Sequence, residues 1–292
     1  MRIGYYPGCS LTGTAREFDI STRKVARMLG MELVEVPDWN CCGATSAHAV
    51  DRALSLALPA RVLAMAEQAG LDKIVVPCAE CYSRLVSVCV ELKEDSVLMK
   101  TISDIIGMPL KAETEVLNIL QFLNDTGKDT IKGLMETALD GLNIASYYGC
   151  LLVRPPKVVK FDDCEAPVSM DTLVELTGAK SVDWEFKTEC CGAGFSLSKT
   201  EVILDLSGKI IRNAKKCGAD AMVVSCPMCH SNLDMRQLDI MKKTGEALNL
   251  PVLYITQLLC LAMGVKPEEL GLKDHFVTVS GVLEKITAGA EA

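Results

Sequence analysis

The sequence has no basic run and no long apolar run, and these absences exclude several classes of protein. The net charge of −8 and the pI near 5.1 argue against a nucleic-acid groove or an anionic membrane surface as the main partner. The longest apolar run, YITQLLCLAMGV, has about 12 residues, fewer than the roughly 20 that span a bilayer. The first residues, MRIGYYPGCS, contain no apolar signal core. We therefore expect a cytoplasmic protein without direct membrane insertion.

Nucleotide-binding motifs are missing as well. GAGFSL at 192–197 is not the G-x-G-x-x-G of a dinucleotide-binding fold, and GCSLTGT at 8–14 lacks the lysine of a phosphate loop. Neither half of the chain contains the compact C-x2-C-x2-C-x3-C-P run of a ferredoxin. A redox reaction on this chain would therefore draw its electrons from another subunit.

Cysteine, in contrast, is abundant. Without an export signal, the 14 cysteines indicate a reducing compartment, where thiols serve metals or redox chemistry more often than structural disulfides. Ten of them form two copies of one pattern, C-x31-CC-x35-C-x2-C and C-x39-CC-x34-C-x2-C. The ten are Cys9, Cys41, Cys42, Cys78, Cys81, Cys150, Cys190, Cys191, Cys226 and Cys229.

The sequences around these cysteines repeat too, which indicates a duplicated domain. YYPGC at 5–9 matches YYGC at 147–150, and IVVPCAEC at 74–81 matches MVVSCPMC at 222–229. The offsets of 141, 149 and 148 residues are far longer than the period of a solenoid repeat. We divide the chain into an N-terminal domain at 1–140, which includes a helical connection at 92–140, and a C-terminal domain with a tail at 141–292.

Each copy predicts strands and helices in alternation. The apolar runs RIGYYP, ELVEVP and KIVVP end just before the cysteines of the first copy, and NIASYY, AKSVDW and AMVVS do so in the second. Helical stretches between them close at Gly30 and Gly70. We expect an α/β fold of two pseudo-symmetric, Rossmann-like halves with parallel sheets and a helical insertion between them. The cysteines would then lie at the C-terminal edge of each sheet, where such folds bind ligands.

Thiolates bind both zinc and iron-sulfur clusters, so two kinds of site are open at this point. A tetrahedral zinc site uses four ligands, and each half offers five cysteines. Adjacent residues in extended backbone point to opposite sides, so a Cys-Cys pair can reach two irons, and the following glycine allows turns that other residues cannot make. A thioredoxin-like C-x-x-C is a further alternative, but it leaves the Cys-Cys pairs, Cys9 and Cys150 unexplained.

The two patterns resemble the cysteine-rich CCG domains of the heterodisulfide reductase B-subunit family. The resemblance covers both halves, from Cys9 to Cys229, and the spacer of 34 residues before Cys226 is one shorter than the family's usual value. It implies two non-cubane 4Fe-4S clusters, each held by the five cysteines of one half. It also implies that a disulfide lying between the clusters is cleaved by two one-electron transfers, with the substrate thiols binding cluster irons as intermediates.

The resemblance further implies a catalytic subunit of a larger complex. Its partners would be a ferredoxin-like iron-sulfur subunit and a flavin-containing, electron-bifurcating subunit, with a hydrogenase or formate dehydrogenase as a further member. The methanogenesis substrate, coenzyme M joined to coenzyme B, is implied only if the source makes those cofactors. Two alternatives stay open: an iron-sulfur electron-transfer subunit of a lactate-, glycerol-3-phosphate- or succinate-type respiratory complex that passes electrons to a quinone, and a zinc-stabilised scaffold.

The remaining candidate residues receive a weak functional role or none. His230 directly follows Cys229 and is a weak candidate for a proton donor, while an ordinary helix histidine is the simpler interpretation of both His230 and His48. Arg154 lies near Cys150 and could meet an anionic substrate, although a surface role is the safer expectation. No role is assigned to His275 or to the four remaining cysteines, Cys89, Cys164, Cys217 and Cys260.

Overall fold

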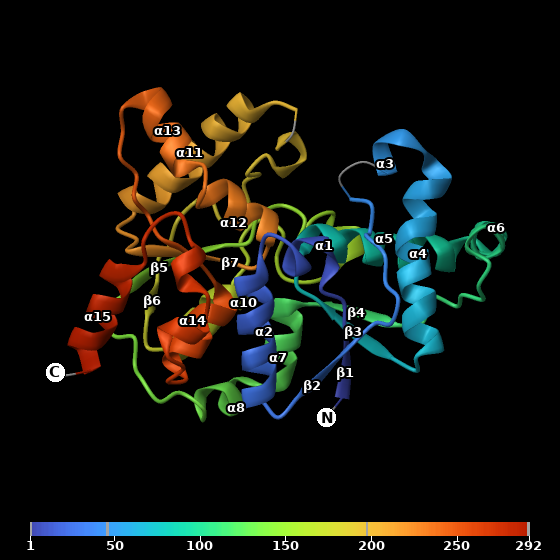
Figure 1. The fold of residues 1–292 in the computed structure, drawn as a ribbon, viewed down its shortest axis with the longest axis horizontal. Coiled ribbons are helices and arrows are strands. Elements are labelled where there is room, and N and C mark those ends of the chain that lie inside the picture. Colours follow the sequence, from blue (N-terminus) through green and yellow to red (C-terminus); the bar gives the residue numbers. More distant parts are fainter. Residues whose placement is uncertain (1, 45–46, 197, 291–292) are drawn as a thin grey trace.

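The computed structural model describes residues 2–44, 47–196 and 198–290, and it confirms the predicted α/β fold. Two four-stranded parallel sheets are present, one in each half (Figure 1). The first sheet has the order β2-β1-β3-β4 and consists of β1 (Arg2–Tyr5), β2 (Glu32–Glu35), β3 (Lys73–Val76) and β4 (Glu115–Asn118). The second has the order β6-β5-β7-β8 and consists of β5 (Asn143–Tyr147), β6 (Lys180–Ser181), β7 (Ala221–Val224) and β8 (Val252–Tyr254).

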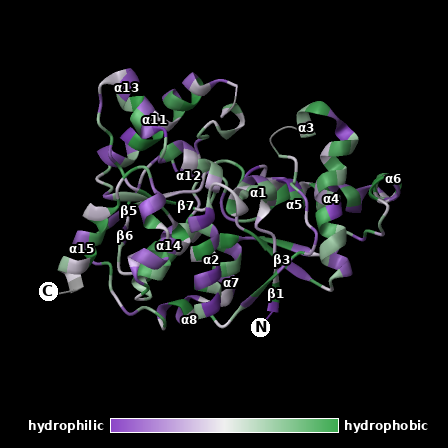
Figure 2. Cartoon of the chain, in the orientation of Figure 1, coloured by the Kyte–Doolittle hydropathy of each residue, from purple (hydrophilic) through white to green (hydrophobic). Residues whose placement is uncertain are grey.

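Helices connect the strands and cover the sheets. In the first half they are α1 (Gly8–Thr12), α2 (Arg16–Met28), α3 (Ala47–Val50), α4 (Arg52–Gln68), α5 (Ala79–Glu94), α6 (Ser96–Ile106), α7 (Ile119–Thr126) and α8 (Lys128–Lys132). In the second half they are α9 (Pro156–Val159), α10 (Ser169–Leu176), α11 (Thr200–Lys216), α12 (Pro227–Leu233), α13 (Gln237–Thr244), α14 (Ile255–Ala262) and α15 (Ser280–Ala290), with short 3-10 turns at η1 (Ala193–Phe195), η2 (Pro267–Glu269) and η3 (Leu272–Asp274). Figure 2 shows hydrophobic residues gathered on the buried elements, such as α7, and mixed polarity along α2.

The connection at 92–140 is not helical throughout. Glu115–Asn118, expected to begin a helix, is strand β4 and pairs in parallel with β3. Its apolar run is too short for periodicity to separate strand from helix, and pairing with the buried β3 decides in favour of the strand. The following α7 begins with a capping box of Asn118 and Gln121, and α14 begins in the same way with Tyr254 and Gln257. The repeat therefore extends one strand and one helix beyond the C-x-x-C of each half.

The expected helix after the first Cys-Cys pair is also divided. Asp51 adopts extended backbone (φ −151°, ψ 134°), and its carboxylate accepts a hydrogen bond from the backbone N–H of Leu54 at 2.7 Å. This cap begins α4, so α3 and α4 are separate helices.

The tail after Lys266 packs on the rest of the second half. The buried carboxylate of Asp234 accepts hydrogen bonds from the backbone N–H groups of Phe276 (2.7 Å) and Val277 (3.0 Å). Val282 of α15 is also buried. Two backbone donors that would otherwise face water are thus satisfied, and the tail becomes part of the second half.

The two halves meet through α2 and α14, which lie side by side in the middle of Figure 1. The rings of Phe18 and Tyr254 stack with centroids 4.1 Å apart. The hydroxyls of Ser21 and Thr256 lie 2.7 Å apart and share a hydrogen bond in a buried site. These contacts fix the C-terminal edge of one sheet relative to the other, which is what a site shared by both halves requires.

Candidate metal centres at the sheet edges

Both cysteine sets lie at the C-terminal edges of the sheets, as predicted. Cys78 and Cys226 are the N-cap residues of α5 and α12, directly after β3 and β7. Cys9 lies in α1, directly after β1. Six of the ten cysteines are buried, whereas Cys150 is partly exposed and three others are exposed, namely Cys9, Cys41 and Cys190.

The first set converges from three segments. The Sγ atoms of Cys42 and Cys81 are 3.1 Å apart, and those of Cys9 and Cys41 are 4.0 Å apart. The chain segments after β1 and β2 and the helix after β3 thus bring their thiols into contact. Residues separated by about 70 positions in the chain become one cluster because parallel strands deliver their C-terminal ends to the same edge.

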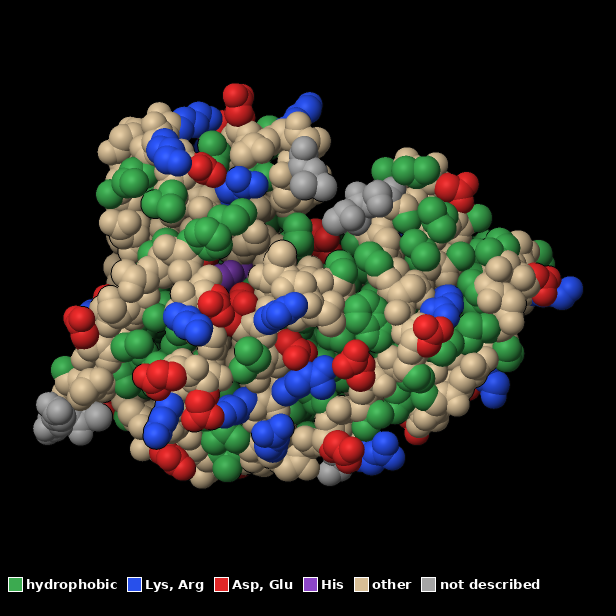
Figure 3. All heavy atoms as spheres, in the orientation of Figure 1, with side chains coloured by type: hydrophobic (Ala, Val, Ile, Leu, Met, Phe, Trp, Pro, Cys, Tyr) green, Lys and Arg blue, Asp and Glu red, His purple; other side chains and the backbone are tan. Residues whose placement is uncertain are grey.

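The cysteines of the second set also come together, and a cavity lies beside them. The Sγ atoms of Cys191 and Cys229 are 3.7 Å apart. A cavity of about 270 Å³ is lined by all five cysteines of this half, together with residues of α5 from the first half. The molecule is hollowed between its two lobes in Figure 3.

The glycine after each Cys-Cys pair is required by the backbone. Gly43 has φ +74° and Gly192 has φ +83°, a region that other residues adopt only with strain. The turn aims the Gly43 N–H at the Sγ of Cys41 (3.4 Å) and the Gly192 N–H at the Sγ of Cys190 (3.3 Å). This geometry explains why the C-C-G sequence occurs in both halves.

The glycine before the first cysteine of each set is needed because a cysteine sulfur lies close to its Cα. A Cβ on Gly8 would lie 3.2 Å from the Sγ of Cys81, and a Cβ on Gly149 would lie 3.1 Å from the Sγ of Cys229. Both glycines also have positive φ, at +65° and +67°. The loop after the first strand of each half can therefore pass beside the C-x-x-C sulfur only because no side chain intervenes.

Two buried tyrosines hold the segments that carry the Cys-Cys pairs. Tyr6 donates a hydrogen bond to the carbonyl of Asn40 at 2.8 Å, and Tyr147 donates one to the carbonyl of Glu189 at 2.6 Å. Each accepting residue directly precedes a Cys-Cys pair. The hydroxyls thus anchor the segments that lead into both Cys-Cys turns.

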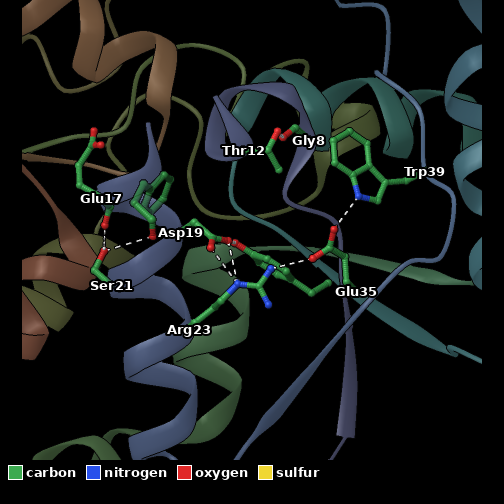
Figure 4. Close-up of polar contacts among 10 residues, drawn as sticks. Gly8, Thr12, Glu17, Asp19, Ser21, Arg23, Glu35 and Trp39 are labelled. Atoms are coloured by element: carbon green, nitrogen blue, oxygen red, sulfur yellow. Dashed lines mark hydrogen bonds and ion pairs between the residues drawn. The ribbon is translucent and has the colours of Figure 1, made fainter. Parts of the chain in front are cut away.

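A polar network steadies the same approach in the first half (Figure 4). Arg23 of α2 donates to both carboxylate oxygens of Asp19, at 3.0 and 2.8 Å, and to Glu35 at the end of β2, at 2.9 Å. The other oxygen of Glu35 accepts the indole N–H of Trp39 at 2.8 Å. The chain leading from β2 to Asn40 is therefore tied to α2.

The thiols influence one another's ionisation. Hydrogen bonds from Cys41 and then Cys81 lower the pKa of Cys42 to about 3, and a hydrogen bond from Cys150 lowers the pKa of Cys190 to about 6. Donating these bonds raises the pKa values of Cys41 and Cys150. Because neighbouring thiolates repel each other, each set can ionise fully only with positive charge among its sulfurs.

This donor set fits an iron-sulfur centre. Five soft sulfur donors converge in each half, and in the second half all five border one cavity. Within the described part of the chain, no three His, Cys, Asp or Glu side chains are already placed to hold a single metal ion together.

His230 and Arg154 contact residues other than the cysteines of the two sets. His230 is buried, its Nε2 lies 3.0 Å from the carbonyl oxygen of Val252, and its ring stacks on Tyr254 with centroids 4.4 Å apart. Burial lowers its pKa to about 3, and it borders a separate cavity beside α2. Arg154 is engaged with Glu165 at 2.8 Å and with Thr188.

The remaining candidates add no further member to the clusters. The side chain of His48 lies outside the described residues. His275 is buried and its Nε2 is 3.0 Å from Gln257. The four cysteines outside the repeat stay without an assigned role: Cys89 and Cys260 are buried in the core, Cys164 is partly exposed and Cys217 is exposed.

Sequence reasoning missed several residues of the site. Asn232 donates its side-chain N–H to the Sγ of Cys191 at 3.5 Å. Glu80, Ser83 and Arg84 of α5 line the cavity of the other half. Glu80 lies inside the C-x-x-C, and a marginal signal for the others is their spacing of one helical turn after Glu80. That these α5 residues of the first half lie beside the cysteines of the second half can be seen only in the three-dimensional structure.

Comparison with known proteins gives consistent results for both halves. A family model described as a cysteine-rich domain (CCG) matches residues 3–86 and 144–234. The B subunit of a ferredoxin/F420H2-dependent CoB-CoM heterodisulfide reductase from Methanosarcina acetivorans is 36% identical to this chain, over 98% of this chain and 97% of that protein. The 8-methylmenaquinol:fumarate reductase membrane anchor subunit of Wolinella succinogenes is 32% identical, over 94% of this chain and 96% of that protein.

A solved structure shares the fold. A hypothetical protein from Helicobacter pylori superposes with a TM-score of 0.75 at 12% sequence identity. The match covers 95% of this chain and 52% of that chain, so this chain spans about half of that protein. Among the helices that the structure describes, none has the length and apolar character to cross a membrane.

Proposed function

Because this chain belongs to the heterodisulfide reductase B-subunit family, we propose that it is the catalytic subunit of a disulfide reductase complex. The reaction takes one small organic disulfide, two electrons and two protons to two thiols. The observation that carries the proposal is the gathering of five cysteines at the sheet edge of each half, with a cavity that is bordered by all five cysteines of the second half and by α5 of the first.

The cysteines would hold two non-cubane 4Fe-4S clusters, one in each half. Such centres exchange single electrons, so a pair of them can supply the two electrons of a disulfide one at a time. The glycine N–H groups at Gly43 and Gly192 orient one sulfur in each half, and the Asn232 side chain donates to another. The hydrogen bonds from Tyr6 and Tyr147 keep both turns in place.

The cavity supplies a place for the substrate. It lies between α5 of the first half and the cysteine loops of the second, so both halves border the bound molecule. Its wall contains the ring of Tyr148, whose hydroxyl is engaged with Asp171 at 2.6 Å. Aromatic and apolar walls with a few polar groups are typical of small-molecule sites.

The chain would work in the cytoplasm within a larger complex. A ferredoxin-like iron-sulfur subunit would deliver electrons, and a flavin-containing subunit that bifurcates electrons would feed it, together with a hydrogenase or formate dehydrogenase. A disulfide of the coenzyme M–coenzyme B type is the substrate where the source makes these thiols, as in methanogenesis. On the face shown in Figure 3, basic and acidic side chains are intermixed, which fits a protein partner better than a nucleic acid.

A second function has its own support. The similarity to the membrane anchor subunit of a menaquinol:fumarate reductase favours an electron-transfer subunit linked to quinones. In that case the cluster pair would pass electrons on, and no disulfide would be consumed.

Two matched substitutions test the proposal. Cys42→Ser and Cys191→Ser each remove one ligand from one half, so we expect each protein to keep its fold by circular dichroism and to lose about half of the roughly eight irons and sulfides expected per wild-type chain. Disulfide reduction with a reduced viologen dye should fall at least tenfold in both. Cys217→Ser, at an exposed cysteine outside the repeat, is the control. Full iron content and activity in both variants would refute the site, and zinc without sulfide would refute the clusters.

A further inference from the structure

The cavity in the second half contains a basic side chain that forms no ion pair with any residue that the structure describes. Arg84 of α5 lines it together with the five cysteines of the other half. Within the residues that the structure describes, its guanidinium has neither an ion pair nor a hydrogen bond. Arg23, Arg61 and Arg154, in contrast, each pair with a carboxylate.

A second polar group on the same wall is also without a partner. Ser83, the neighbour of Arg84, is 7% exposed and lines the cavity, and its hydroxyl has no hydrogen bond to any described residue. A hydroxyl at the wall of a cavity can donate a hydrogen bond to a molecule bound there. An arginine and a serine that both lack partners in one cavity form a donor pair prepared for an acceptor that comes from outside.

The helix that carries both residues is rigid and well placed. α5 begins directly after its N-cap residue Cys78, and the side chains of Leu85 and Val88 are buried in the core. Arg84 therefore projects from the first half toward the sulfurs of the second. The carboxyl of Glu80, one turn earlier, is the other charged group of this wall.

We propose that Arg84, assisted by the Ser83 hydroxyl, binds an anionic group of the disulfide and thereby selects acidic substrates. The group is a carboxylate, sulfonate or phosphate on the thiol half that is delivered to the cysteines of the second half. This inference rests on the proposed function. It makes Arg84 a specificity-determining residue, since a planar guanidinium forms paired hydrogen bonds with such acceptors.

The pseudo-symmetry of the chain makes this assignment directional. The position equivalent to Arg84 in the second half, six residues after Cys226, is Asn232, and its amide is engaged with Cys191. The corresponding helix thus presents a neutral side chain that already has partners. An acidic group is therefore recognised on one side of the molecule, and the two thiol halves of an unsymmetrical disulfide are told apart.

Equilibrium binding to the holoprotein tests the proposal. The probes are dithiodiglycolate, which carries two carboxylates, and bis(2-hydroxyethyl) disulfide, which is uncharged, each titrated anoxically by calorimetry without a reductant. Wild type should bind the dianion more tightly. Arg84→Gln should weaken dianion binding by about 10- to 100-fold and change binding of the neutral disulfide by less than threefold. Arg84→Lys should recover part of the loss, and Ser83→Ala should lose a few-fold.

The controls separate anion recognition from other roles. Arg27→Gln, on the exposed end of α2, should leave both affinities unchanged. If Arg84 only offset the negative charge of the thiolates, Arg84→Gln would weaken both probes equally or lower the iron content, and either result would overturn the proposal. Equal affinity of wild type for the two disulfides would do so as well.

The failure of the proposed function has a different signature. Iron and sulfide analysis, and turnover of the neutral disulfide with a reduced viologen, report on the reductase itself. If these are negative while Arg84→Gln still removes the preference for the dianion, the cavity binds anions in a protein that is not a reductase. If turnover is present without that preference, the reductase stands and the role of Arg84 falls.

Discussion

At the scale of single residues, glycine allows the tight turns that bring the cysteine sulfurs together. Gly43 and Gly192 occupy the left-handed region and each points its N–H at the sulfur two residues earlier. A Cβ on Gly43 would also lie 2.8 Å from the Cβ of Ala47. In a variant with a side chain at position 43, backbone strain and steric conflict would thus coincide at the turn after the Cys41-Cys42 pair.

We expect Gly43→Ala to reduce iron in the first half. The left-handed backbone costs about 1–2 kcal/mol for alanine, and the contact with Ala47 forces the turn to move. Gly70→Ala is the matched control, because Gly70 has φ +67° but no atom within 4 Å of the position that a methyl group would take. The control should lose a similar amount of stability and keep its iron. Thermal unfolding and iron analysis of both variants decide the matter, and unchanged iron in Gly43→Ala would contradict the prediction.

Much of the candidate site could be predicted at this scale, because the repeated spacing of the cysteines in the sequence identifies the candidate ligands. The ten cysteines, their sheet edge and their grouping by halves followed from the repeat. Tyr6, Tyr147 and Asn232 did not, since each acts through an atom 34 or more residues away. Arg84 was missed for the same reason, and Arg154, suggested by its position near Cys150, is engaged with Glu165.

At the scale of elements, the repeat unit is longer than the cysteine pattern. Strand β4 with α7 and strand β8 with α14 complete the two halves, and both helices begin with a capping box. The strands that precede cysteines could be predicted from their apolar runs, whereas β4 runs directly into the apolar start of α7 and reads as part of that helix. Its identity comes from pairing with β3, which is a tertiary interaction.

The attachment of the tail should depend on pH. Burial raises the pKa of Asp234 to about 6, against an ordinary value of 3.8, although two backbone N–H groups oppose the rise. A raised folded-state pKa gives stability that is present below the unfolded value and is lost as pH rises through 6. Relative to Asp234→Asn, wild type should therefore lose up to about 1.4 kcal/mol per pH unit between pH 5 and 6 and level off above 7.

Melting temperatures of the two proteins from pH 5 to 8 test this dependence, because the difference between them removes the contribution of the metal centres. Asp205→Asn is the control. Asp205 is exposed and its pKa is lowered, chiefly by its hydrogen bond with Lys243, so its effect lies below pH 4. Parallel curves for wild type and Asp234→Asn would show that the carboxyl does not titrate in this range.

At the scale of the whole molecule, the two halves share a core. Helices α2 and α14 pack on each other through Phe18, Ser21, Tyr254 and Thr256. The hydroxyl of Tyr82 donates to the carbonyl of Val159 at 3.4 Å and ties the halves a second time, near the cavity. A joint core keeps two cysteine sets in register, which two domains on a flexible linker would not do.

We therefore expect the halves to unfold as one unit. Phe18→Ala removes a fully buried ring stacked on Tyr254 and should cost about 3–5 kcal/mol, and because the loss falls on the shared core, hydrogen exchange should speed up in strands of both sheets. Leu63→Ala, within α4 of the first half, costs a similar amount, about 2–5 kcal/mol, and should accelerate exchange in both sheets if unfolding is joint. Exchange that speeds up only in β1–β4 in both variants would mean that the halves unfold separately, and that their common edge is held by the metal centres alone.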